Sequence, residues 1–197
     1  MIAVRVDTLP RVGATALVRG PRVHLRLLGA GDRDAFLEAV ERSRPLHRPW
    51  SRPPHTASTF ADYLRTHRPP AHATLVVVRN ADDALLGVYA ISQIFQGNFK
   101  SAYLGYNAFE PFAAQGYMSE GMWLVFRYAF DTLGLHRLQA NVQPGNVRSI
   151  ALLRATGWRE EGYARRYLKI GGRWRDHVMF AILAEDRGHS SGARRRA

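Results

Sequence analysis

Apolar and polar positions along this chain follow two different periods. Residues 137–142 alternate strictly between apolar and polar side chains, which predicts a half-buried strand. From Met118 to about Thr132 the apolar residues recur at helical spacing, and Gly134 is a typical helix stop. The same reasoning predicts, in chain order, a strand at 23–27, helices at 32–43 and 58–67, strands at 74–78, 85–95 and 101–106, the helix at 118–132, the strand at 137–142, a helix from 146 to 157, and strands at 158–170 and 173–183.

Turn residues support this order of elements. The pair Gly171-Gly172 lies between two long strand patterns and predicts a tight hairpin. Four prolines between residues 45 and 54 predict a loop without regular structure, which contains Trp50. Strand, two helices, three strands, helix, strand, helix and hairpin together predict a mixed α/β fold.

Length and composition indicate one soluble domain in a chain of 197 residues. We expect an N-terminal extension at 1–20, the domain at 21–184 and a basic disordered tail at 185–197. The chain has no cysteine, which excludes disulfides, thiolate zinc sites and a cysteine nucleophile. The histidines show no ligand-like pairing, so we expect no metal. Without a signal-peptide pattern or a membrane-spanning run, a cytoplasmic location is expected.

The net charge is +12 at pH 7, and Lys100 and Lys169 are the only lysines. Such a surface attracts polyanions, which include nucleic acid, ribosomes and phosphate-rich cofactors. The alternative explanation of this excess of basic residues is a genomic composition that replaces lysine by arginine. Basic and aromatic residues do not follow the pattern of a nucleic-acid-binding module, so charge alone assigns no function.

Two predicted helix starts carry the candidate chemistry. The turn at 113–119 is rich in small residues and opens a helix, so its backbone N–H groups are available to an anion. Asn146 is a good helix N-cap, with Ser149 three residues later. The alternatives are an ordinary strand-to-helix corner and an ordinary capping pair. Because strand 138–142 separates the two segments in sequence, both helix starts are expected beside the C-terminal ends of neighbouring strands, where α/β sheets bind ligands.

From about Tyr103 to Ile182 the chain resembles GNAT N-acetyltransferases of the ribosomal-protein alanine N-acetyltransferase type. The similarity lies in several short runs that occur in the same order. They are Gly116–Glu120, Leu133–Arg137, Asn141-Val142, Asn146 with Ser149, Gly157-Trp158, Glu161-Gly162 and Gly172–His177. The resemblance implies a single GNAT domain, with a mostly antiparallel twisted sheet that is splayed in the middle and flanked by helices.

The resemblance also implies acetyl-CoA as cosubstrate. In such a site the backbone N–H near Ala108 would stabilise the oxyanion, and Ser149 would protonate the thiolate. The implied cofactor-binding residues are Asn107, Ala108, Phe109, Ala114, Gln115, Gly116, Tyr117, Met118, Ser119, Asn141, Asn146, Ser149 and Arg154.

The implied acceptor is a primary amine, with a protein N-terminal α-amine ranked first, and ribosome association and a homodimer as further options. A small-molecule amine acetyltransferase, for a polyamine, antibiotic or amino-acid derivative, is one alternative. A non-catalytic CoA-binding or RNA-associated protein is another. The expected acceptor-binding residues, several of which would serve equally well as core, are Ser43, Arg44, Trp50, Phe95, Tyr103 and Tyr167.

The sequence departs from the family pattern at five positions. Ala113 stands where the turn usually has Gln or Arg, Ala114 where it often has glycine, Met118 replaces its last small residue, and Gly121 replaces an alanine. Where some relatives place a carboxylate before the last hairpin, this chain has Leu168. The general base therefore stays open between a water relayed by backbone carbonyls, Glu110 and Asp176.

Overall fold

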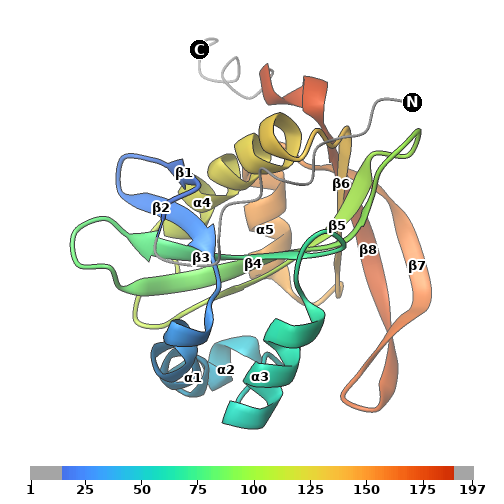
Figure 1. Cartoon of the computed structure of the whole chain (residues 1–197). Coiled ribbons are helices and arrows are strands. Elements are labelled where there is room, and N and C mark those ends of the chain that lie inside the picture. Colours follow the sequence, from blue (N-terminus) through green and yellow to red (C-terminus); the bar gives the residue numbers. More distant parts are fainter. Residues whose placement is uncertain (1–14, 189–197) are drawn as a thin grey trace, which may run out of the picture.

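The structure is a computed structural model that describes residues 15–188, and its centre is one eight-stranded sheet (Figure 1). The strand order is β1-β2-β3-β4-β5-β6-β8-β7, and every neighbouring pair is antiparallel except β5 with β6. The strands are β1 (Val18–Arg19), β2 (Val23–Leu27), β3 (Ala73–Arg79), β4 (Leu85–Phe95), β5 (Ser101–Ala108), β6 (Arg137–Val142), β7 (Arg159–Ile170) and β8 (Arg173–Leu183).

Helices cover both faces of this sheet (Figure 1). On one face a core cluster joins the sheet to α4 and α5, and on the other a second cluster joins it to α1 and α3. The helices are η2 (Ala30–Asp32), α1 (Arg33–Arg42), α2 (Arg44–His47), α3 (Ala57–Thr66), α4 (Tyr117–Phe126), the π-helical η3 (Arg127–Thr132), α5 (Val147–Ala155) and η4 (Ala184–Gly188). In the described part of the chain, no helix has the length and apolar character needed to cross a membrane.

The pairing of β5 with β6 is short, and this creates a gap in the sheet. Ser101–Tyr103 pair in parallel with Arg137–Gln139, and beyond these three pairs the strands diverge. Near the end of β5 the Phe109 N–H donates to the Leu86 carbonyl at 2.9 Å. Because hydrogen-bonding groups alternate between the two edges of a strand, the N–H of the preceding residue, Ala108, is directed toward the gap.

The mixed α/β sheet flanked by helices confirms the predicted fold class, and most elements begin and end within two residues of their predicted bounds. One local prediction is wrong, because residues 44–47 form the helical turn α2 inside the region expected to be irregular. Its Pro45 lies in the first turn, where a proline has no hydrogen bond to lose.

Regular structure continues on both sides of residues 21–184. Val18–Arg19 of the expected extension pair with β2, and residues 185–188 of the expected tail belong to η4. Residues 1–14 and 189–197 lie outside the described part of the chain.

An enclosed ion pair links β2 to the start of α1. The Asp32 carboxylate accepts hydrogen bonds from Arg26 Nη1 at 2.8 Å and Nη2 at 2.6 Å, and from the Gly29 N–H at 2.8 Å. The two side chains are only 16% and 12% exposed. The pair therefore fixes the direction in which the chain leaves the sheet, and removal of one partner leaves the other charge largely enclosed.

We expect Asp32→Ala to lower the free energy of unfolding by about 3 kcal/mol, since it leaves the Arg26 guanidinium without its carboxylate. Urea denaturation followed by tryptophan fluorescence measures the change. Asp34→Ala is the matched control, because the Asp34 side chain is 83% exposed in its ion pair with Arg33. Equal losses in both variants would show that the enclosed pair contributes nothing specific.

Candidate functional site

A cavity of about 1470 Å³ passes through the gap between β5 and β6. Thr59 and Tyr63 of α3 border it from one face of the sheet, and Ser149 and Leu152 of α5 border it from the other. It therefore connects the two faces at the point where the sheet opens. The predicted site residues that line it are Trp50, Asn107, Ala108, Ala114, Gly116, Met118, Ser119, Asn141, Asn146 and Ser149.

The first turn of α4 offers free backbone donors at one wall of the cavity. Gly116 is the N-cap of α4, with a left-handed φ of 81° that favours glycine. The first intrahelical bond runs from the Glu120 N–H to the Gly116 carbonyl at 3.1 Å, so the N–H groups of residues 117–119 precede it. These groups and the helix dipole suit an anion such as a phosphate.

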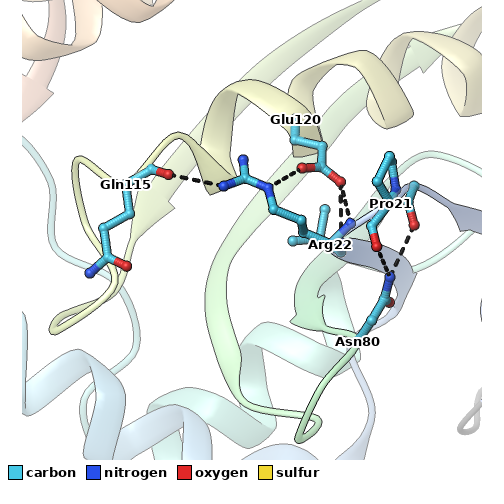
Figure 2. Close-up of polar contacts among 7 residues, drawn as sticks. Pro21, Arg22, Asn80, Gln115 and Glu120 are labelled. Atoms are coloured by element: carbon cyan, nitrogen blue, oxygen red, sulfur yellow. Dashed lines mark hydrogen bonds and ion pairs between the residues drawn. The ribbon is translucent and has the colours of Figure 1, made fainter.

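An ion pair holds this turn against β2 (Figure 2). The Glu120 carboxylate accepts from the backbone N–H and the Nε of Arg22, both at 2.8 Å, and from the Val23 N–H at 3.3 Å. The Arg22 guanidinium also lies 4.7 Å from the centre of the Tyr117 ring and donates weakly to the Gln115 carbonyl at 3.4 Å. Glu120 is therefore a structural carboxylate, and it does not line the cavity.

Ser149 lies at the start of α5, where Asn146 caps the helix. The Asn146 Oδ1 accepts the Ser149 N–H at 3.2 Å, so the predicted capping pair is present. The Ser149 Oγ lies 2.6 Å from the Tyr106 hydroxyl on β5. Burial raises the pKa of Tyr106, although its bond to Ser149 opposes this. The two hydroxyls thus form a short hydrogen bond that joins β5 to the start of α5.

The end of β5 is held by the segment that follows α1. His47 is 5% exposed, and its Nε2 donates to the Ala108 carbonyl at 2.8 Å. Burial lowers the pKa of His47, so the ring is neutral at pH 7. The Ser51 hydroxyl donates to the Asn107 Oδ1 at 2.6 Å. These bonds fix the strand end that carries the Ala108 N–H.

Two predicted acceptor residues, Tyr103 and Tyr167, lie beside the cavity lining. The Asn141 Nδ2 donates to the Tyr167 hydroxyl at 3.2 Å, and the Asn141 Oδ1 is buried with no partner among the described residues. Burial raises the pKa of Tyr167, and a hydrogen bond with Tyr103 raises it further. The structure thus brings Asn141, Tyr103 and Tyr167 together on the face that α1 and α3 cover.

Three other predicted acceptor-binding residues do not reach the cavity. The Ser43 hydroxyl is fully buried and donates to the Ala39 carbonyl at 2.6 Å, which makes Ser43 a structural residue. Arg44 pairs with Glu41 on the surface, and Phe95 is 49% exposed away from the lining.

Some predicted cofactor residues also lie outside the lining. Phe109 is fully buried in the second core cluster, because the chain turns under α1 after β5. Arg154 pairs with Glu160 at 2.9 Å, and the Gln115 side chain donates to the Pro111 carbonyl at 2.8 Å.

His177 lines the cavity, although it was not among the residues predicted from the sequence. It directly follows Asp176, one of the expected base candidates, which instead accepts from the Tyr163 hydroxyl and the Arg166 N–H. Glu110, the other candidate, does not line the cavity. The sequence signal for His177 was the Gly172–His177 run itself, in which the histidine directly follows the candidate carboxylate.

Comparison with known proteins gives the family. A family model described as acetyltransferase (GNAT) domain matches residues 22–159. The chain is 41% identical over 106 residues to the probable N-acetyltransferase YjcK of Bacillus subtilis, which covers 54% of this chain and 59% of that protein. It is 40% identical over 102 residues to the ribosomal protein uS5-alanine N-acetyltransferase of Escherichia coli, covering 52% and 53% respectively. The chain thus spans little more than half the length of these relatives.

Solved structures share the fold. RimJ of Mycobacterium smegmatis in complex with CoA-disulfide has a TM-score of 0.76 and 27% identity, covering 83% of each chain. Spermidine N-acetyltransferase from Vibrio cholerae in complex with CoA and spermine has a TM-score of 0.72 and 21% identity, covering 84% of this chain and 98% of that one.

We expect Glu120→Gln to reduce the free energy of unfolding by about 2 kcal/mol at pH 7, since charged hydrogen bonds are lost. Burial raises the pKa of Glu120, but the bonds from Arg22 and Val23 outweigh it and place the pKa below the ordinary 4.5. A lowered folded-state pKa gives stability that is complete above 4.5 and disappears as the pH falls through the lowered value.

The measurement is urea denaturation of both proteins from pH 7 into the acid range, where the difference should close as the Glu120 carboxyl becomes protonated in the folded as well as the unfolded state. Glu38→Gln is the control, because its pair with Arg42 leaves the Glu38 side chain 76% exposed. A difference that stays constant with pH would contradict the role of the ionised carboxylate.

Proposed function

The chain belongs to the GNAT acetyltransferase family, and on that premise we propose that it transfers an acetyl group from acetyl-CoA to a primary amine, the N-terminal α-amine of a protein ranking first. The observation that carries the proposal is the gap between β5 and β6. There the Ala108 N–H and the Ser149 hydroxyl border one cavity that opens to both faces of the sheet.

The residues at the gap fit acetyl-CoA. The N–H groups of residues 117–119 would hold the pyrophosphate, and the left-handed Gly116 brings the backbone to the surface without a side chain in the way. Asn146 and Ser149 would flank the pantetheine arm. When bound, acetyl-CoA supplies a thioester carbonyl carbon to an attacking amine, with the CoA thiolate as leaving group.

The chain's own groups would stabilise or neutralise the charges that develop in this reaction. The Ala108 N–H, directed into the gap, would donate to the carbonyl oxygen as it becomes negative. The Ser149 hydroxyl would donate its proton to the leaving sulfur, while the Tyr106 hydroxyl at 2.6 Å supports the Ser149 oxygen. Attack then needs a neutral amine on the other side of the sheet.

The charge around the cavity favours an acceptor with acidic groups. Arg52, in the loop after α2, lines it, and the one lining carboxylate among the described residues, Asp62 of α3, is itself paired with Arg65. A polycation such as spermidine would find no unpaired carboxylate there. This supports a peptide acceptor over the small-amine alternative, as does the name of the uS5-alanine relative. A ribosomal-protein acceptor would place the enzyme in the cytoplasm.

Thiol release from acetyl-CoA tests the function directly. The panel contains peptides that begin with Ala, Ser or Met, spermidine and aminoglycosides. We expect turnover with a peptide, faster when acidic residues follow its N-terminus. The same peptides with blocked N-termini are the control and should release no thiol.

Two outcomes of this assay would overturn the first-ranked acceptor. Turnover with small amines alone would establish the small-molecule alternative. Tight acetyl-CoA binding without turnover of any acceptor would favour the non-catalytic alternative. Ala113 and Leu168, where the chain departs from the family pattern, would then be the candidate causes of the lost turnover.

We expect Ser149→Ala to lower kcat by about 10²-fold, because the leaving thiolate loses its proton donor. Acetyl-CoA affinity, measured by calorimetry, should stay near the wild-type value. Ser58→Ala is the matched control, since Ser58 is exposed on α3 and does not line the cavity. A wild-type rate in Ser149→Ala would assign the proton to another donor.

A further inference from the structure

His177 stands where an acceptor amine would approach the gap. On β8, Val178 pairs with Val142 of β6 and packs with Phe180 and Ile182 on the α4 face. Because side chains alternate along a strand, His177 projects to the opposite face, the one that α1 and α3 cover. There its ring lies 5.6 Å from the ring of Tyr167, beside Asn141, and borders the cavity.

The hydrogen bonds of His177 define its tautomer. Its Nδ1 lies 3.0 Å from the Arg175 carbonyl oxygen, which can only accept, so Nδ1 carries the proton. In the neutral ring Nε2 then holds a lone pair. Among the described residues no hydrogen bond to Nε2 is found, and His177 lines the cavity. Nε2 is not among the fully buried polar atoms without a partner, so it keeps some accessible surface.

The surroundings keep this ring neutral. His177 is 2% exposed, and burial lowers its pKa, against smaller opposing effects of the Arg175 carbonyl and Asp176. The titratable and charged groups around it are Tyr167 on β7, Tyr103 on β5, and Asp176 and Arg175 on β8. The Asp176 carboxylate is already held by Tyr163 and Arg166, so its charge is not free to pair with the ring.

His47, the other buried histidine at the cavity, differs in one respect. It donates from Nε2 to the Ala108 carbonyl, and its remaining Nδ1 is buried with no partner among the described residues. No amine can reach that nitrogen, so His47 positions the strand end. His177 lines the cavity, and its unbonded Nε2, unlike the Nδ1 of His47, is not fully buried.

We propose that His177 is the general base of the acetyl transfer, accepting at Nε2 a proton from the acceptor ammonium. This inference rests on the proposed function and assigns the general base, which the family resemblance left open. It requires the acceptor to enter from the face of the sheet that α1 and α3 cover, opposite Ser149.

The protons balance through two groups. His177 Nε2 takes one proton from the ammonium, and the neutral nitrogen then forms the N–C bond as the C–S bond breaks. The thiolate gains its proton from Ser149. The second proton, which leaves the nitrogen as the amide forms, passes through water to Ser149 and replaces the one that Ser149 donated. His177 afterwards releases its proton to water, so each turnover yields amide, thiol and one proton.

The test is the pH dependence of kcat in the full chain, with whichever acceptor the assay panel identifies. We expect wild-type kcat to fall at low pH with an apparent pKa below 6.5, the ordinary histidine value, because protonated His177 cannot accept. His177→Gln should lower kcat by about 10²-fold and lose this dependence. Imidazole added to His177→Ala should restore part of the rate.

His136→Gln is the matched control, since His136 pairs with Glu185 on the surface and should keep the wild-type profile. Calorimetry with CoA shows whether each variant remains folded. A folded His177→Gln with the wild-type rate and acid limb would overturn this assignment and leave the proposed function intact. A wild-type protein that turns over no acceptor would overturn the proposed function, and with it this inference.

Discussion

The early separation of β5 and β6 is the constraint on which the rest of the site depends. After three residue pairs β6 continues with β8, and β5 continues with β4, so facing edges of both strands are left unpaired. Unpaired backbone groups are costly unless a ligand or water satisfies them. The same break that weakens the sheet therefore supplies a directed donor at Ala108 and the opening that joins its two faces.

Each face contributes a different kind of group to that opening. The α4 and α5 face brings helix starts, whose free N–H groups and capped hydroxyl come from local sequence. The opposite face brings side chains from strands and from the segment after α1, which meet only through tertiary packing. In the proposed reaction, acetyl-CoA with its phosphates and the acceptor with its ammonium would thus approach from different faces of the sheet. They would not compete for the same protein groups.

This difference explains what the sequence could and could not predict. The strict alternation in β6, the Gly171-Gly172 turn and the Asn146 cap are local patterns, and the structure contains all three. Ser43 was expected to bind the acceptor, but its hydroxyl is buried and accepts a hydrogen bond from the backbone N–H of Glu110, 67 residues away in sequence. The orientation of His177 likewise depends on the register of β8 against β6, which no local pattern specifies.

The segment after α1 has a consequence for how acceptor recognition and rate are linked. His47 and Ser51 bind the last residues of β5, and Trp50 between them lines the cavity and approaches Gly145. In the proposed reaction, an acceptor in contact with Trp50 would therefore act on the strand end that carries the Ala108 N–H, the proposed oxyanion donor. Binding energy from parts of the acceptor remote from its amine would then serve to align this N–H. A shortened acceptor should therefore lower kcat more than it lowers the affinity for the acceptor.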